Sequence, residues 1–491
     1  MAKVKEFFKE NKIELLLVIL TIIISANVIL QKPLNNLDEV WNYNFARNIA
    51  ENKIPYRDFN IVQLPGLFII VGLLLKISNE LIVTRILAII LSAGIVLSAY
   101  KLMKKLNIDK HIAAFASGFI LYAICNHLSL DYNFFNLFLI LIIMNLEFKE
   151  KNNNFIIGLF CGCSFLVKQT TGGLLIIATI IYKLIKDRKK INIKDIALRI
   201  LGAFIPIVIF VLYLLINKAM YDFWDYVVMG MTTFSNKKSY LNLMQKNKLL
   251  IQALSIIIPA YLVGGTIWGL VKKDNYLLLI LYGLVSFSVV YPIADDLHFL
   301  IGCVPAIIGI VYALYLTAYK MFKNNHIKKV LLFIKYASEC GFYLLAIFTC
   351  CLGIYKFNGT INTINEKKSE LAHFSYIPVD EKLENEIKKI DEYILKQDKN
   401  IYILDATAAI YMIPINRYNK DYDMFLKGNI GGAGEEGQIN KVKNMKNTLL
   451  LIKKKKESRN WQTPSNVIEY IESNYEVINN IGAFNIYFLE E

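Results

Sequence analysis

Residues 15–24 read LLLVILTIII, and nine of these ten residues are aliphatic. They lie in an apolar stretch over 13–31, which is long enough for a helix that crosses the hydrocarbon core of a bilayer. Comparable stretches recur as far as residue 356 and give the 491-residue chain a hydrophobic content of 55% and a mean hydropathy of +0.42. This composition excludes a disordered chain and indicates a protein that crosses the membrane many times.

We predict eleven membrane-spanning helices in an α-helical polytopic protein. They cover residues 13–31, 82–101, 112–127, 132–148, 154–168, 171–186, 196–217, 250–271, 276–293, 298–320 and 337–356. One more apolar stretch, 64–77, has only 14 residues and begins Leu64-Pro65-Gly66. Because it is short for a crossing, we expect it to form a re-entrant or interfacial helix.

The distribution of Lys and Arg predicts which side of the membrane each loop faces. With the N-terminus in the cytoplasm, the inner segments hold 23 Lys and Arg in 59 residues, and the outer segments hold 11 in 97. Cytoplasmic loops are enriched in these residues. We therefore expect a multi-pass cell-membrane protein with a cytoplasmic N-terminus, a long first outer loop over 32–81 and an extracytoplasmic C-terminal domain.

The sequence predicts a transmembrane domain over 1–356 and a small α/β domain over 357–491. From residue 356 onward the chain holds 19 basic and 20 acidic residues, so the net charge of +15 comes from the membrane part. This basic excess follows from short loops between spans and does not indicate a nucleic-acid partner. Short apolar and amphipathic runs predict strands over 401–404, 448–452, 476–481 and 484–489, and helices over 380–396 and 464–473.

A GxGxxG pattern occurs in this tail at Gly432–Gly437. A dinucleotide-binding fingerprint requires a strand that leads into the glycines and a helix that follows them within a βαβ unit. No clear strand precedes the pattern here, so we expect a flexible surface loop.

Unusual polar residues concentrate in the segments predicted to lie outside. Asp38 and Glu39 open the stretch 37–50, where Trp41, Phe45 and Ile49 recur at helical spacing. That periodicity predicts an amphipathic helix on the membrane surface. The other such residues are Arg57, Gln63, Asp131, Lys168, Asp295, Asp296 and His298. The alternative interpretation is structural, with solvated charges, an interfacial anchor and a lysine that snorkels.

The pattern of these motifs resembles the GT-C class of membrane glycosyltransferases, in its protein O-mannosyltransferase and aminoarabinose-transferase branch. The resemblance covers roughly residues 10–356 and rests on four features. They are Asp38-Glu39, Pro55-Tyr56-Arg57-Asp58-Phe59 followed by Pro65-Gly66-Leu67, Asp131 at the outer end of a span, and Lys168-Gln169-Thr170 at an outer hairpin.

The resemblance implies an enzyme that moves a hexose or pentose from a polyprenyl-phosphate carrier to a lipid, glycan or protein acceptor in the cell envelope, with inversion. The catalytic residues would be Asp38 as the general base and Asp131 as a second acidic residue that orients Asp38 or the acceptor. The phosphate would be bound by Lys168, Arg57 and His298, because negative charge grows on the leaving group. Supporting roles would fall to Glu39, Gln63, Asp295 and Asp296.

Two departures weaken the residue-by-residue transfer. Many relatives have a Lys or His immediately before the Pro that opens the segment after the loop, whereas this chain has Gln63-Leu64. Some relatives carry a divalent cation near the acids, for which Glu39, Asp295 and Asp296 are candidate ligands, although no spacing here demands a metal. The alternatives are a transporter or flippase of lipid-linked sugars, a polymerase of envelope polysaccharide, or a non-catalytic scaffold.

Overall fold

The structure is a computed structural model that describes residues 10–34, 37–148, 153–233, 238–272, 275–321, 328–366, 369–454 and 463–490. The chain folds into two compact units. The first comprises Met1–Leu30, Arg85–Val208 and Lys237–Ile361, and the second comprises Gln31–Thr84, Ile209–Asn236 and Asn362–Glu491. The second unit therefore combines three parts of the chain. They are the predicted first outer loop, the segment Ile209–Asn236 and the tail.

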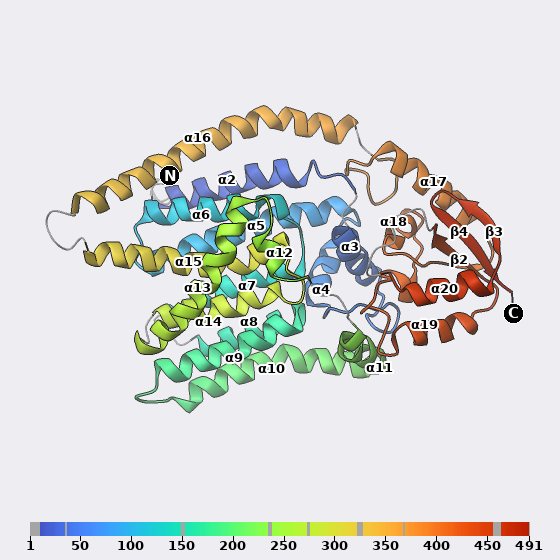
Figure 1. Cartoon of the computed structure of the whole chain (residues 1–491), viewed down its shortest axis with the longest axis horizontal. Coiled ribbons are helices and arrows are strands. Elements are labelled where there is room, and N and C mark those ends of the chain that lie inside the picture. The colour runs from blue at the N-terminus through green and yellow to red at the C-terminus, as the bar shows by residue number, and fades with distance from the viewer. Residues whose placement is uncertain are drawn as a thin grey trace. The chain divides into compact units, whose positions relative to one another are not determined.

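Each of the eleven predicted spans is a helix in the structure (Figure 1). These helices are α2 Lys12–Ile29, α5 Leu81–Lys105, α6 Lys110–Ile124, α7 Tyr132–Glu147, α8 Asn154–Val167, α9 Gln169–Lys186, α10 Ile193–Ile216, α13 Leu249–Lys272, α14 Asn275–Phe287, α15 Asp296–Met321 and α16 Lys328–Glu366. Among the described residues, six helices are long and apolar enough to cross a membrane, namely α2, α5, α10, α13, α15 and α16. The number of eleven crossings stays a prediction.

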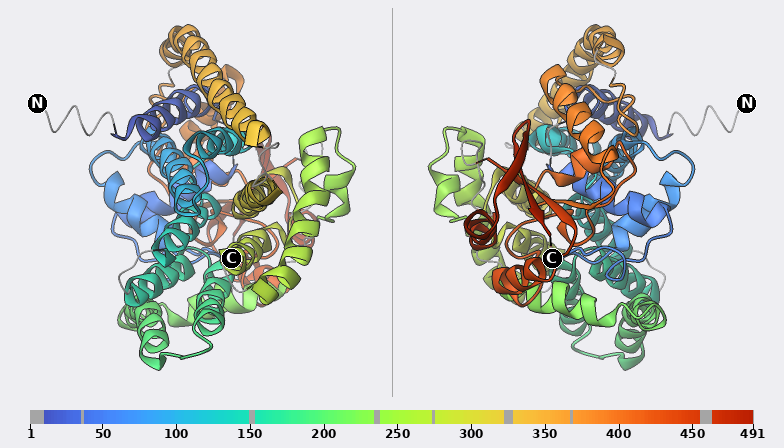
Figure 2. Two further views of the ribbon diagram at one scale, coloured as in Figure 1. Left: turned by 90° about the vertical axis from the view of Figure 1, so that its left-hand side faces the viewer. Right: turned by 90° about the vertical axis from the view of Figure 1, so that its right-hand side faces the viewer.

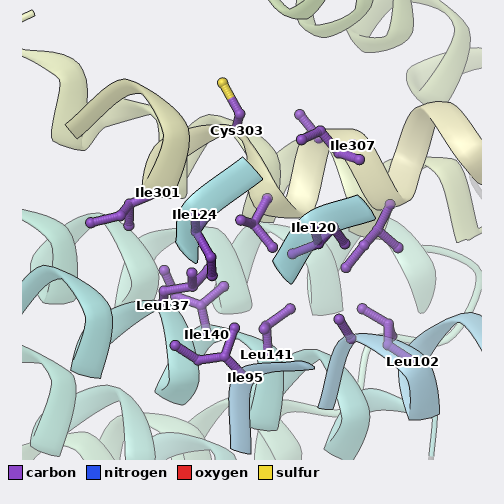
Figure 3. Close-up of a cluster of buried hydrophobic side chains, with 14 of the residues drawn as sticks. Ile95, Leu102, Ile120, Ile124, Leu137, Ile140, Leu141, Ile301, Cys303 and Ile307 are labelled. Carbon is purple, nitrogen blue, oxygen red and sulfur yellow. The ribbon is translucent and has the colours of Figure 1, made fainter. Parts of the chain in front are cut away.

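The core of the first unit is formed by aliphatic side chains from α5, α6, α7 and α15 (Figure 3). The residues at its centre are Ile95, Leu102, Ile120, Ile124, Leu137, Ile140, Leu141, Ile301, Cys303 and Ile307. Pairs such as Ile120 and Ile124 are four residues apart, so they lie on one face of their helix and pack together. Dispersion between these closely packed side chains holds the helices together.

Glycines bring α8 very close to its two neighbours. A Cβ atom at Gly158 would lie 2.0 Å from the carbonyl oxygen of Arg199 on α10, and one at Gly162 would lie 2.3 Å from that of Ala203. One at Gly172 on α9 would lie 2.2 Å from the backbone of α8. The spacing of Gly158 and Gly162 is the GxxxG pattern that allows close helix packing in membranes. The α8–α9 hairpin, whose tip carries Lys168, is therefore closely packed both internally and against α10.

A buried ion pair lies within this bundle. Arg199 donates to the two carboxylate oxygens of Glu147 at 2.7 and 2.8 Å, and also to Asn154 Oδ1 and to the carbonyl of Thr179. Both residues fall within predicted spans, Glu147 in 132–148 and Arg199 in 196–217. Glu147 neutralises the Arg199 guanidinium, which donates four hydrogen bonds. These interactions offset the cost of removing the two charges from water.

The tail contains a four-stranded sheet in the order β1-β2-β4-β3, whose strands are orange to red in the right-hand view of Figure 2. Strands β1 Asn400–Ile403 and β2 Thr448–Lys453 are parallel, whereas β3 Val477–Ile481 and β4 Phe484–Leu489 form an antiparallel hairpin at Gly482. Gly482 has a φ of +50°, which suits a residue without a Cβ. All four strands were expected, as were α17 Glu381–Leu395 and α20 Ser465–Asn474.

Two helices of the tail were not predicted, α18 Ala408–Met412 and α19 Gly434–Lys443. The expected flexible loop at Gly432–Gly437 is a turn that leads into α19, so that prediction is wrong. The amide of Gly432 donates to Asp225 Oδ1 at 2.9 Å, and a Cβ at Gly431 would lie 2.4 Å from Asp225 Oδ2. These glycines allow a carboxylate of the chain itself to approach the backbone closely.

The second unit also contains α3 Leu37–Ala50 and α4 Gly66–Leu75, together with α11 Met220–Phe223 and a π-helical turn at Trp224–Met229. Helix α3 was predicted with the correct bounds, and its apolar side chains are buried against other residues of the second unit. Trp41 donates to the carbonyl of Ala406 at 2.9 Å, and Phe45 packs on Phe59 and Phe68. Polar residues of the opposite face are buried too, Arg47 among them, because the tail covers them.

Candidate functional site

Asp131 is the N-cap of α7. Its Oδ1 accepts hydrogen bonds from the amides of Asn133 at 2.7 Å and Phe134 at 3.0 Å, while Oδ2 is 3.4 Å from Asn133 Nδ2. The side chain is buried, and burial raises the pKa of Asp131, although the amide of Phe134 and the charges of His298 and Lys168 oppose this. Oδ1 thus accepts hydrogen bonds from the amides of the helix N-terminus, and Oδ2 can accept a further hydrogen bond.

Lys168 lies between α8 and α9, where the hairpin turns. Its Nζ donates to Asn133 Oδ1 at 2.8 Å and lies 5.3 Å from the centre of the Tyr132 ring. Burial lowers the pKa of Lys168 to about 8, and the nearby Asp131 carboxylate offsets part of this effect. Lys168 is thus half-buried, and its ammonium is held by residues at the start of α7.

His298 lies in the first turn of α15, and Asp295 precedes that helix. Asp295 Oδ1 accepts from the amide of His298 at 2.9 Å and lies 2.8 Å from its Nδ1. Burial alone would raise the pKa of Asp295, but these hydrogen bonds and the charge of His298 outweigh it, so the pKa is lowered. Asn133 links Asp131 to Lys168, because it contacts the Asp131 carboxylate and accepts a hydrogen bond from Lys168. The charge of His298, like that of Lys168, lowers the pKa of Asp131.

Asp296 is occupied elsewhere. Its carboxylate accepts hydrogen bonds from Lys246 and, at 2.6 Å, from Lys248, both of which precede α13. These two lysines neutralise it, and this contact ties the segment before α13 to the start of α15. The structure thus gives Asp296 a structural contact that sequence reasoning did not anticipate.

The remaining predicted site residues belong to the second unit. Asp38 and Glu39 occupy the first turn of α3, where Asp38 is exposed and the helix dipole favours a carboxylate. The Arg57 guanidinium is already paired with a carboxylate, since its Nε and Nη2 each donate to Asp58 at 2.8 Å. The hydrogen bond from Arg57 lowers the pKa of Asp58. Gln63 has a buried Oε1 without a hydrogen-bond partner among the described residues.

A divalent cation does not fit the predicted ligands well. Within the part of the chain that the structure describes, no group of three or more His, Cys, Asp or Glu side chains is placed to hold a metal ion. Asp296 is engaged by two lysines, and Asp295 is engaged by His298. No step of the chemistry is therefore assigned to a metal.

Sequence reasoning missed a polar layer one turn below Asn133 and Lys168. Ser164 Oγ donates to Asn136 Oδ1 at 2.8 Å, whereas Asn136 Nδ2 and the Thr171 hydroxyl are buried without a partner among the described residues. The signal was present, because Asn133 and Asn136, like Lys168 and Thr171, are three residues apart on apolar helices.

Comparison with known proteins gives only distant structural likeness. No family model matches the chain, and no curated protein matches it. Two solved structures of the Archaeoglobus fulgidus oligosaccharyltransferase are similar in fold, one tethered by a disulfide to an acceptor peptide with the NVT sequon and one in complex with Zn and sulfate. Their TM-scores are 0.45 and 0.43, with identities of 14% and 13% over 84% and 82% of this chain. The chain spans less than two thirds of their length, at 64% and 61%.

Proposed function

We propose that this chain is an integral-membrane glycosyltransferase of the GT-C class. It moves a sugar from a polyprenyl-phosphate carrier to an envelope acceptor on the outer face of the membrane, and it inverts the anomeric carbon. The C-terminal domain shares that face, and the N-terminus is cytoplasmic. The observation that carries the proposal is the contact of Lys168 with Asn133, directly beside the Asp131 N-cap at the start of the apolar helix α7.

The chemistry requires two things from the protein. The acceptor hydroxyl must lose its proton as it attacks the sugar, which calls for a general base. The departing polyprenyl phosphate gains negative charge, which calls for positive charge on its oxygens. No strong general acid is needed, because a phosphate is already a good leaving group.

Lys168 supplies the positive charge in this proposal. Its ammonium is held by Asn133 and sits partly out of water, so its attraction to a phosphate is screened less than that of a surface lysine. An ammonium has three donors, and Asn133 takes one of them. His298 adds a second cation when it is protonated, whereas Arg57 would first have to leave Asp58.

The two carboxylates have different roles in the proposal. Asp131 caps α7 and faces two cations, so we assign it to positioning the acceptor or the cations rather than to proton transfer. Asp38 is exposed in the first turn of α3, and by family resemblance it is the general base. Glu39 and Gln63 stay proposed as supporting residues of the same segment.

Mass analysis of envelope glycans and glycoproteins tests this function. We expect a sugar substituent to disappear when the gene is deleted and to return with the parent gene but not with Asp38→Asn. If the protein were a flippase, deletion of the gene would make the donor lipid accumulate on the cytoplasmic leaflet. The Asp38→Asn gene would then complement the deletion. Restoration by the Asp38→Asn gene would therefore contradict the proposed enzyme.

A further inference from the structure

The tail of the second unit contains a small cavity beside the edge strand of its sheet. It has a volume of about 150 Å³ and is lined by Ile394, Lys399, Asn400, Ile401, Tyr402, Met412, Arg417 and Tyr418. Pockets for drug-sized ligands are larger, at roughly 300–1,000 Å³. The cavity therefore suits a single small unit with both polar and apolar faces.

Two cationic residues line this cavity, Lys399 and the exposed Arg417. The Lys399 ammonium lies 3.4 Å from the centre of the Phe488 ring, and neither residue forms an ion pair with any residue that the structure describes. The buried Tyr418 hydroxyl has no hydrogen-bond partner among the same residues. Two cations and an unpaired buried hydroxyl are the groups that an anionic polar ligand satisfies.

The wall formed by residues 413–418 is held in place by α3. Arg47 donates to the carbonyls of Ile413 at 3.2 Å and Arg417 at 3.0 Å, and its guanidinium lies 4.6 Å from the centre of the Tyr418 ring. Arg47 is fully buried. Arg47 thus binds the Arg417 backbone and leaves the Arg417 side chain available to a ligand.

We propose that this cavity binds one anionic sugar unit, that is, a saccharide residue that carries a phosphate or a carboxylate. Lys399 and Arg417 bind the anionic group, and Asn400 and the Tyr418 hydroxyl bind ring hydroxyls. Ile394, Ile401 and Met412 pack on the apolar face of the ring. If the proposed function holds, the ligand is part of the acceptor glycan, which docks on the tail of the transferase.

Binding to the full-length protein in lipid nanodiscs tests the proposal without any donor. The probes are glucuronic acid, glucose 6-phosphate, glucose and inorganic phosphate, titrated by calorimetry at low ionic strength. We expect at least one of the two charged sugars to bind, and glucose and inorganic phosphate to bind more weakly by about tenfold or more. The two charged sugars distinguish a carboxylate from a phosphate as the preferred group.

Substitutions locate the site. Arg417→Gln and Lys399→Gln should each weaken binding by about tenfold, Arg417→Lys should weaken it less, and Tyr418→Phe should weaken it while keeping the ring over Arg47. Lys382→Gln removes the same charge from a different part of the tail and should bind like the parent. Equal affinity for glucose and the charged sugars, tight binding of inorganic phosphate, or unchanged affinity in both Gln variants would overturn the proposal. Binding without transfer would reject only the enzymatic function.

Discussion

The ammonium of Lys168 donates a hydrogen bond to Oδ1 of Asn133 across 2.8 Å. This contact joins the tip of the α8–α9 hairpin to the first turn of α7, immediately after Asp131. A lysine that only snorkelled would extend to water and would not be fixed by a buried amide. The relationship therefore favours a lysine held in position for an anionic partner.

Replacing Lys168 tests this role. We expect Lys168→Gln to lower the turnover rate by about tenfold or more, because the leaving phosphate loses a charged partner in the transition state. Lys168→Arg should keep more activity, though not all, since the guanidinium is larger and planar. The rates should be compared with a purified polyprenyl-phosphate-sugar donor and a fixed acceptor. If both variants match the parent, His298 becomes the leading phosphate ligand.

The pH profile gives a second test of Lys168. Its pKa of about 8 means that the ammonium loses its proton as the pH rises through that value. Turnover should therefore fall above about pH 8 in the parent enzyme. In Lys168→Arg this limb should move to higher pH, because a guanidinium stays protonated there. An alkaline limb that is identical in the two proteins would assign the titration to another group.

Asp38 is expected to be required for transfer. Asp38→Asn keeps the size of the side chain but removes the base, so the rate should fall by at least about a hundredfold, the lower end of general-base effects. Expression in the membrane should not change, because Asp38 is exposed. A transfer assay on equal amounts of purified protein measures this, and near-parental turnover would remove Asp38 from the mechanism.

Helix packing around Gly162 is expected to control stability. A Cβ at this position would lie 2.3 Å from the carbonyl oxygen of Ala203, so Gly162→Leu should destabilise the first unit by about 1–3 kcal/mol or more. Gly264→Leu is a matched control, because nothing lies within 4 Å of a Cβ at Gly264 on α13. Thermal unfolding in one detergent compares the two, and equal midpoints would show that α8 and α10 are less closely packed than described.

The orientation of the tail can be tested by chemical labelling. We expect a cysteine placed at Asn440, which is exposed on α19, to react with a membrane-impermeant thiol reagent in intact cells. Arg188→Cys, in the exposed turn after α9, should react only after lysis. Both variants belong in a background without the seven native cysteines. The reverse pattern would invert the topology and move the proposed site to the cytoplasm.

Much of the fold followed from local sequence patterns. Apolar runs located a helix at each of the eleven predicted spans, and short runs around Gly482 located the closing hairpin. Both succeeded because hydrophobic length and turn chemistry are local properties. The burial of α3 was not local information. The sequence predicted an amphipathic helix on the membrane surface, and only the fold brings the carbonyls of Ala406 and Ile413 to Trp41 and Arg47.

The sequence predicted which residues belong to the candidate site, but it did not predict the contacts that they make. Asp131, Lys168 and His298 stood out as polar residues at the ends of apolar runs. Their grouping depends on how α7, α8 and α15 pack, which spacing along one helix does not determine. The commitment of Arg57 to the neighbouring Asp58 depends on side-chain rotamers, and the commitment of Asp296 to two lysines depends on tertiary structure.

The central claim is that this chain transfers a sugar from a lipid phosphate, and one assay measures it directly. Purified protein in nanodiscs is incubated with a polyprenyl-phosphate donor carrying a radiolabelled sugar and with an envelope glycan fraction from cells that lack the gene. We predict that label moves from the lipid to the glycan with the parent protein, and at least about a hundredfold more slowly with Asp38→Asn. Label that stays on the lipid with the parent protein, or that moves equally fast with the variant, would contradict the account.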